Sequence, residues 1–518
     1  MGLAPLVLAL ALGRCECPQV PEPPPGIPDG PVSWSYIAVG ADGAQGRARG
    51  FDGAVPVGAS IEVLDGAELL GVASPDSRGR FDLAFRPPEA AKVTLRVTLA
   101  EAEAEPLSLE FPLKDMQQAL DAAVNPRLGA TGSMPNHLAL VPALASADDV
   151  PVLIVNSGDN NVDNLGLSSG RRLLQPLSLP AQSGSGGPRP AQPYAVAVLD
   201  QRAAVTRFGQ SAVTLFNAAT GAVLAEIQET QAVALPQPFT PATPVDADGD
   251  GTPESVVTAI LPRGFEGLAF AGSRLFVAAA NVLRTTAPVV YAPGLLLAYE
   301  VGATSLSRPA APRVFTAFEN PQFVLGLGDA VAVVESGVLE QTAQGWQATR
   351  DGGVELFDAA TLQRRWQANL GRLAPGAVAL SPDGQSLYVS SMLKPEIYKL
   401  DVASGQILRG ASDPIRLFSA SEVQSLFGLE AHPMGLLFAT CFNSDQVFVV
   451  DTANDSVSPW PFVKPLQVGE GGQAFAGAQA LALRPGRNGV DFRGADLAVL
   501  LNLAARVATV DTRFVMGP

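Results

Sequence analysis

The sequence of 518 residues predicts an all-β protein in which a small β-sandwich precedes a seven-bladed β-propeller. Three observations lead to this prediction. Gly and Pro occur 51 and 44 times, which favours many turns over long helices. Strictly alternating apolar residues indicate short strands near the start of the chain. A four-strand unit then recurs seven times, and closing such units into a ring leaves no long exposed sheet edge.

The alternating strands lie in residues 32–113. VTLRVTL at 93–99 alternates at period two, and the same alternation returns at 107–111. Period two buries one face of a strand and leaves the other in water, as in a β-sandwich. Residues 114–134 follow as a connector, and LKDMQQALDAAV at 113–124 predicts a short helix there.

The repeat is clearest at 379–408, ALSPDGQSLYVSSMLKPEIYKLDVASGQIL, which reads as four strands joined by turns. Its second strand is short and apolar, and it recurs seven times: at 152–157, 203–208, 274–281, 331–336, 387–391, 436–443 and 497–502. We therefore expect the propeller over 135–518, with an insertion near 229–262. An open sandwich of many strands is the alternative.

Two family resemblances agree with this organisation. GASIEVLDGAELLGVASPDSRGRFDLAF at 58–85 resembles bacterial immunoglobulin-like and carboxypeptidase-regulatory-like modules, which implies an Ig-like β-sandwich over 32–113. YVSS at 388–391, NSGDNNV at 156–162 and LDVASG at 400–405 resemble the YVTN family of surface-layer and YncE-like propellers. That family includes surface and binding proteins, and related propellers include lactonases, so the resemblance implies a fold but selects no activity.

The start of the chain is expected to direct export. LAPLVLALAL at 3–12 has the length of a signal-peptide core and is too short to span a bilayer as a mature helix. We expect a signal peptide over 1–14, a Pro-rich tether over 15–31, and a location in the cell envelope or outside the cell. The layout resembles a bacterial lipoprotein signal, which implies lipidation of Cys15. A plain secretory signal cleaved nearby is the alternative, because Arg14 departs from the lipoprotein pattern.

DADGDGTPE at 246–254 predicts a calcium loop. It supplies carboxylates at its first, third, fifth and ninth positions and a carbonyl at its seventh: Asp246, Asp248, Asp250, Glu254 and Thr252. Calcium prefers six to eight oxygen ligands, which a tight acidic loop provides. Val257 stands where an EF-hand needs a glutamate, so the loop is more similar to the DxDGDGxxD loop of FG-GAP-type propeller repeats. A solvated acidic turn is the alternative.

Polar loops between second and third strands predict a binding face. These loops and the calcium loop are expected on one face of the ring, where an unknown protein or small-molecule ligand would bind. The residues assigned to this binding face are Asn156, Asp159, Asn160, Asn443 and Asp445. The alternative is that they are ordinary turn formers.

Composition limits the function classes. The net charge is −16 and no block of basic residues occurs, so nucleic acid is not an expected partner. The two histidines, His137 and His432, and a Cys441 in an apolar run leave few groups for acid–base catalysis. We therefore expect a non-enzymatic envelope or surface binding protein with no catalytic residue, in contact with membrane only through a lipid anchor. A calcium-assisted hydrolase such as a lactonase-like propeller is the alternative. The chain has only four Trp residues, which argues against a quinoprotein dehydrogenase with its regular tryptophan repeat.

Overall fold

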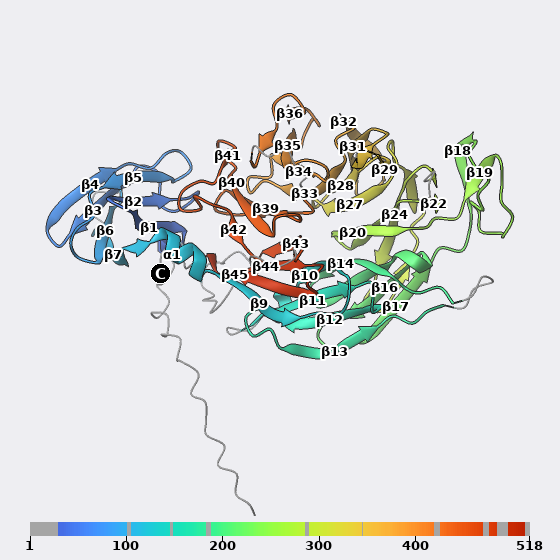
Figure 1. Cartoon of the computed structure of the whole chain (residues 1–518), viewed down its shortest axis with the longest axis horizontal. Coiled ribbons are helices and arrows are strands. Elements are labelled where there is room, and N and C mark those ends of the chain that lie inside the picture. Colours follow the sequence, from blue (N-terminus) through green and yellow to red (C-terminus); the bar gives the residue numbers. More distant parts are fainter. Residues whose placement is uncertain are drawn as a thin grey trace, which may run out of the picture.

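The computed structural model describes residues 30–100, 105–145, 149–182, 188–284, 290–343, 345–418, 425–469, 476–483 and 496–512. Strands dominate these residues, and within them the only α-helix is α1 (Met116–Ala122). Three short 3-10 helices accompany them: η1 (Trp34–Tyr36), η2 (Pro142–Leu144) and η3 (Phe208–Gln210). The all-β prediction is confirmed (Figure 1). The signal peptide and Cys15 lie outside the described residues. Within them, no helix has the length and apolar character needed to cross a membrane.

The first unit of the chain is a β-sandwich of two four-stranded sheets (Figure 1, blue). One sheet has the order β5 (Phe81–Phe85), β2 (Gln45–Gly50), β1 (Ile37–Asp42), β8 (Lys114–Asp115); the other has the order β4 (Glu68–Ala73), β3 (Ser60–Asp65), β6 (Lys92–Thr98), β7 (Leu107–Pro112). Val93, Leu95 and Val97 point into the shared core, as their period-two spacing predicts.

Seven further sheets, each with a path of four antiparallel strands, follow in the described part of the chain. The first four have the orders β10 (Pro135–Leu140), β11 (Pro151–Asn156), β12 (Asn161–Gly166), β13 (Arg172–Ser178); β14 (Pro193–Leu199), β15 (Arg202–Arg207), β16 (Ala212–Asn217), β17 (Val223–Gln228); β20 (Phe265–Ala271), β21 (Arg274–Ala279), β24 (Leu295–Val301), β25 (Leu306–Ser307); and β27 (Pro321–Gly326), β28 (Ala330–Glu335), β31 (Gly352–Asp358), β32 (Arg364–Gly371).

The remaining three have the orders β33 (Pro375–Leu380), β34 (Ser386–Ser391), β35 (Glu396–Asp401), β36 (Ile407–Arg409); β38 (Gly428–His432), β39 (Leu436–Cys441), β40 (Gln446–Asp451), β41 (Ser456–Val457); and β43 (Ala478–Leu483), β44 (Leu497–Leu501), β45 (Arg506–Val510), β9 (Val124–Ala130). Short strands β26 (Arg313–Phe315), β37 (Ile415–Arg416) and β42 (Leu466–Gln467) pair with third strands of these sheets.

The sheets are arranged as a β-propeller. The first strand of each sheet contacts the first strand of the next, from β10 through β14, β20, β27, β33 and β38 to β43, and β43 contacts β10. The contacts therefore close on themselves, so these first strands surround a common axis. All the short apolar segments that the sequence analysis assigns to second strands are strands at that position.

Strand β9 closes the ring. It pairs antiparallel with β45, so a segment near residue 127 completes a sheet whose other strands lie beyond residue 477. The segment 114–134, expected to be only a connector, therefore contains a strand of the propeller, which begins at Val124 and not at residue 135. The predicted short helix is α1, capped by the Asp115 carboxylate, which accepts a hydrogen bond of 3.0 Å from the Gln118 amide.

In the part of the chain that the structure describes, three two-stranded hairpins interrupt the regular pattern. Strands β18 (Val233–Phe239) and β19 (Val257–Ile260) form the insertion expected near 229–262 and project from the end of the molecule opposite the sandwich (Figure 1). Strands β22 (Val282–Arg284) and β23 (Val290–Tyr291), and β29 (Leu339–Thr342) and β30 (Gly345–Ala348), form the other two.

The sandwich is joined to the propeller by a continuous apolar core. Phe51 of the sandwich and Met116 and Leu120 around α1 pack in one cluster with Phe438 and Phe462 of the propeller. At its edge, the buried Asp451 carboxylate accepts hydrogen bonds from Arg49 and Arg80 of the sandwich. A shared core and a buried ion-pair network fix the orientation of the two units.

Candidate functional site: the central cavity

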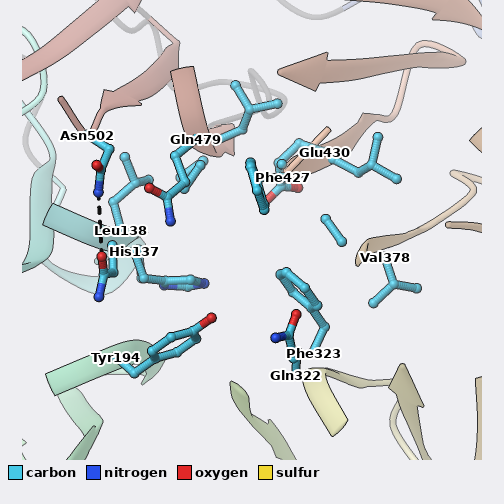
Figure 2. A pocket seen from close by; sticks show the side chains of 18 of the residues that line it. His137, Leu138, Tyr194, Gln322, Phe323, Val378, Phe427, Glu430, Gln479 and Asn502 are labelled. Atoms are coloured by element: carbon cyan, nitrogen blue, oxygen red, sulfur yellow. Dashed lines mark hydrogen bonds between the residues drawn. The ribbon is translucent and has the colours of Figure 1, made fainter. Parts of the chain in front are cut away.

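A cavity of about 1090 Å³ lies on the propeller axis. Six of the described innermost strands line it: β10, β14, β27, β33, β38 and β43. Leu339 and Trp346 of the β29–β30 hairpin also line it, and Trp346 is 57% exposed. Figure 2 shows side chains from opposite sides of the ring pointing into this shared space. A concave, mostly apolar site of this volume is the size expected for a small-molecule ligand.

Local backbone geometry directs polar residues into the cavity. In β10, β27 and β43 the strand register shifts directly around the second residue, which is Asn136, Gln322 and Gln479 respectively. Register also shifts near the starts of β14, β20 and β33. Such bulges reorient a side chain relative to regular pleating. Asn136, Gln322, Gln479 and the corresponding Tyr194 all line the cavity.

The residues before these strands have a recurring backbone conformation. Met134, Gln192, Asn320 and Ala374 all have positive φ, and each directly precedes a proline that starts an innermost strand. A non-glycine residue in this region costs free energy, so its recurrence at one place in four blades shows that the fold imposes it. In three of these strands the residue after the proline lines the cavity: Asn136, Tyr194 and Gln322.

His137 is held as a neutral hydrogen-bonding group. Its Nδ1 accepts a hydrogen bond of 3.5 Å from the Val196 amide on the neighbouring β14. Burial lowers the pKa of His137 to about 4, so the ring is uncharged at neutral pH. With Nδ1 accepting, the remaining proton is on Nε2.

Glu430 is the carboxyl group that faces the cavity from β38 (Figure 2). Burial raises the pKa of Glu430 to about 8. Within the described residues, its carboxyl makes neither an ion pair nor a hydrogen bond, and the cavity lining contains no Lys or Arg. Glu430 therefore keeps its proton at neutral pH unless a cation approaches.

A second acid lies behind the wall. Glu266, on β20, is 4% exposed and hydrogen-bonded by the Tyr194 hydroxyl, while its Oε2 has no partner among the described residues. Burial raises the pKa of Glu266 to about 8. Burial, and to a smaller extent the nearby Glu266 carboxyl, raises the pKa of Tyr194. Tyr194 thus presents a neutral phenol to the cavity.

Most of the predicted binding-face residues accept hydrogen bonds from the segments that lead into the first strands of the blades. Asp159 accepts hydrogen bonds from Ser133, and the Asn160 Oδ1 accepts one of 2.8 Å from the Gln192 amide. Asp445 accepts hydrogen bonds of 2.7 Å from the Ala476 and Gly477 amides. Each of these hydrogen bonds links the turn between the second and third strands of a blade to the segment leading into a first strand.

The other two predicted residues differ from each other. Asn156 is fully buried and donates to the Asn161 Oδ1 and the Asp163 Oδ2, at 2.7 and 2.9 Å. Asn443 accepts a hydrogen bond of 3.0 Å from the Ser425 amide and lines the cavity. Of the five, only Asn443 is therefore part of the cavity wall. Sequence reasoning missed His137, Tyr194, Gln322, Glu430 and Gln479.

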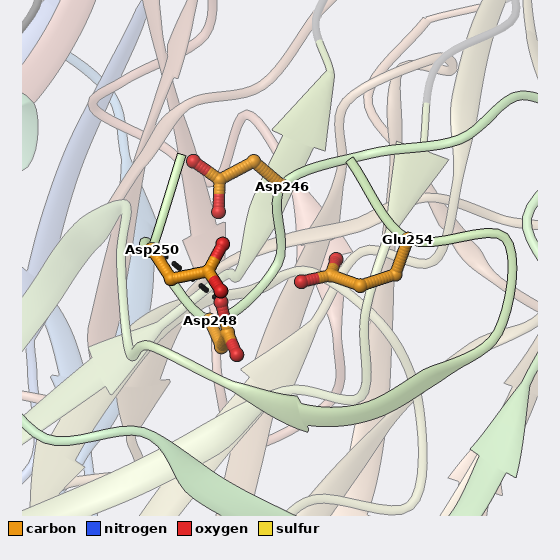
Figure 3. A group of neighbouring side chains, drawn as sticks. All are labelled: Asp246, Asp248, Asp250 and Glu254. Atoms are coloured by element: carbon orange, nitrogen blue, oxygen red, sulfur yellow. Dashed lines mark hydrogen bonds between the residues drawn. The ribbon is translucent and has the colours of Figure 1, made fainter. Parts of the chain in front are cut away.

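The acidic loop lies between β18 and β19. One carboxylate oxygen from each of Asp246, Asp248, Asp250 and Glu254 lies within 4.8 Å of the others (Figure 3). The Asp246 carboxylate accepts from the Gly249 and Gly251 amides at 2.8 and 3.2 Å, and Gly249 and Gly251 both have positive φ. Four converging hard oxygens suit a calcium ion.

The loop is tied to the start of β20 and not to the cavity. The Arg263 guanidinium donates to the Ala247 carbonyl at 2.9 Å, and the Leu261 amide donates to the same carbonyl at 2.8 Å. Thr252 donates its amide to the Asp250 carboxylate at 2.7 Å. None of the four acidic residues lines the cavity.

Comparisons with known proteins found similar solved structures but no matching family. No family model matches the chain, and no curated protein matches it. A solved structure of hydrazine synthase from Kuenenia stuttgartiensis is similar, with 11% identity and a TM-score of 0.48, over 74% of this chain and 97% of that one. A streptogramin B lyase structure is similar with 12% identity and a TM-score of 0.44, over 74% and 94%. Neither likeness bears on the chemistry of the cavity.

Proposed function

We propose that the protein is an exported, non-enzymatic binding protein that holds a small molecule in the channel of its propeller. The observation that supports this most directly is the cavity on the axis, with Asn136, Tyr194, Gln322 and Gln479 turned into it by the bulged strands. Preorganised polar groups in an otherwise apolar cavity orient a ligand. The rigid ring behind them lowers the entropic cost of binding.

The groups in the cavity favour binding over turnover. A hydrolase of the calcium-assisted type requires ionised carboxylates and the ion beside the substrate. The acidic loop that could hold calcium lies outside the cavity. Among the described residues of β38, only Glu430 contributes a carboxyl group to the cavity wall. His137 has a pKa of about 4, too low for an efficient general base near neutral pH.

The proposal predicts that filling the channel abolishes retention of a ligand. The protein is incubated with a small-molecule extract of its host, gel-filtered, denatured, and analysed by mass spectrometry. We expect the wild type to release a compound that Gln479→Trp fails to retain, because the indole occupies the cavity. Gln363→Trp is the matched control, since Gln363 is exposed on the outer rim. A compound retained equally by Gln479→Trp, or by no form of the protein, would contradict channel binding.

Calcium is proposed as a structural ion of the β18–β19 hairpin. Calorimetry should detect one calcium ion per chain, and Asp248→Asn should weaken binding by about tenfold or more, because one charged ligand is lost. The asparagine still accepts from the Asp250 amide, so the turn is preserved. Glu89→Gln, at an exposed position, is the control. No heat of binding by the wild type at millimolar calcium would rule this site out.

Export and lipidation at Cys15 are proposed from the sequence pattern at 1–31. A lipid or secretory route agrees with a binding protein that acts outside the cytoplasm. Mass spectrometry of the chain purified from its host reads the mature N-terminus directly, and a retained Met1 would exclude both routes.

A further inference from the structure

Among its described residues, the wall of the central cavity contains acidic side chains but no lysine or arginine. The titratable side chains among these described lining residues are His137 from β10, Tyr194 from β14, Asp200 from the turn after β14, and Glu430 from β38. His137 is uncharged near neutral pH because its pKa is about 4, so the charged forms available to the described wall at that pH are negative. The whole chain carries a net charge of −16, which favours the approach of cations and disfavours anions.

We propose that the ligand of the central cavity is an organic cation, an amine or quaternary ammonium compound whose charge is bound at Glu430. This inference rests on the proposed function, which requires only that some small molecule binds in the channel. It adds the chemical class of that molecule and the residue that selects it.

The Glu430 carboxyl has no counterion among the described residues. It points into the cavity from β38, and within the described residues its carboxyl makes no hydrogen bond or ion pair (Figure 2). A buried carboxylate without a counterion is costly, and a ligand cation removes that cost. The neighbouring first strands β33 and β43 contribute only uncharged residues to the wall, so they supply no competing cation.

Aromatic side chains surround the same space. Tyr194, Phe323, Trp346, Phe427 and Phe442 all line the cavity, and the rings of Phe427 and Phe442 are in edge contact at 5.5 Å between centroids. The negative face of an aromatic ring attracts a cation, and aromatic cages beside a carboxylate are suited to ammonium groups. The same rings accept the apolar part of an amine.

Binding of a cation should release a proton. Burial gives Glu430 a pKa of about 8, so the empty cavity holds a neutral carboxyl at pH 7. An ammonium group pairs with the carboxylate form, and the displaced proton passes to solvent. His137, with a pKa of about 4, stays neutral throughout and takes no part in this exchange. Affinity for the cation therefore rises with pH until about 8 and then levels off.

The test uses three probes of nearly one shape: phenethylamine, 2-phenylethanol and 3-phenylpropionate. Calorimetry from pH 6 to pH 9 should give the highest affinity for the amine and the lowest for the carboxylate. Below pH 8 the affinity for the amine should rise by up to about tenfold per pH unit, the limit for release of one proton. The alcohol should show no such rise.

Variants assign the effect to one residue. Glu430→Gln should lower the affinity for the amine at pH 8 by about tenfold or more, while 2-phenylethanol binding changes little, because only the charge is removed. Glu430→Asp keeps the charge, so its affinity for the amine should still rise with pH. This variant therefore distinguishes loss of the charge from a folding defect in Glu430→Gln. Glu89→Gln should bind like the wild type.

Several outcomes would overturn the inference. They are an amine affinity no higher than that of the alcohol, an affinity for the amine that falls as pH rises, failure of the wild type to bind any of the three probes, or an unchanged amine affinity in Glu430→Gln. The proposed function is judged separately, by whether Gln479→Trp loses the compound that the wild type retains. A neutral compound retained by the wild type and lost in Gln479→Trp would uphold the channel as a binding site and reject the cation.

Discussion

Replacing Asp451 with alanine is expected to destabilise the protein by about 3–5 kcal/mol, because the buried Arg49 then loses its counterion and Arg80 keeps only its pair with Asp52. Asp451 is 1% exposed and accepts from Arg49 and Arg80, and Arg49 is itself buried with its Nη1 donating to the Trp460 carbonyl at 2.9 Å. These contacts lie where the sandwich meets the propeller. The loss should appear as a lower urea midpoint and as earlier cleavage between the two units in limited proteolysis.

An exposed ion pair provides the control for Asp451→Ala. Asp413 pairs with Arg409 four residues earlier, and the Asp413 side chain is 67% exposed. Surface pairs of this kind contribute about 0–1 kcal/mol, so Asp413→Ala should leave the midpoint almost unchanged. Equal effects of the two substitutions would show that the buried network does not hold the units together.

Stability should fall as pH rises through the range in which Glu266 keeps its proton. The folded chain holds that proton up to a pKa of about 8, whereas an ordinary glutamate loses it near 4.5. Between these values the unfolded state binds fewer protons than the folded state, so the free energy of unfolding decreases with pH. At roughly 1.4 kcal/mol per pH unit, the decrease reaches roughly 4 kcal/mol by pH 8.

Glu266→Gln removes the part of this dependence that is due to Glu266, while the part due to Glu430, whose pKa is also about 8, remains. The amide oxygen can still accept from Tyr194, but no charge develops beside Tyr194 and Tyr291, the titratable groups that face Glu266. We expect urea unfolding at pH 9 to show the variant as more stable than the wild type, with the difference vanishing near pH 5. Glu89→Gln should follow the wild type at every pH. A wild type with the same stability at pH 5 and pH 9 would contradict the account.

Short-range patterns predicted most of the architecture. Apolar second strands bounded by turns recur along the chain, and all of the predicted ones are strands in the structure. The alternating residues 93–97 face the sandwich core as expected. These features depend on local periodicity, which a single sequence displays directly.

Long-range features could not be predicted in the same way. Strand β9 pairs with β45 across most of the chain length, and VNPRLGA has no periodicity that identifies a propeller strand. The docking of Arg49 on Asp451 joins residues from different units. Neither depends on local sequence, so only the folded structure brings these groups together.

The sequence carries a weak signal for the cavity residues. Prolines begin four of the described innermost strands, and three of them precede a cavity-lining Asn136, Tyr194 or Gln322. Aligning the repeats at their first strand would have brought these residues into one column. The polar turn residues Asp159, Asn160 and Asp445, which the sequence predicted to bind a ligand, instead accept hydrogen bonds from the segments that connect the blades.

A crystal structure of the protein with its retained compound would show whether the propeller channel is the binding site. We expect density for the compound inside the ring, with a positively charged group beside Glu430 and an apolar part against the aromatic wall. Density for the compound on the outer surface, with the channel holding only water, would contradict this expectation.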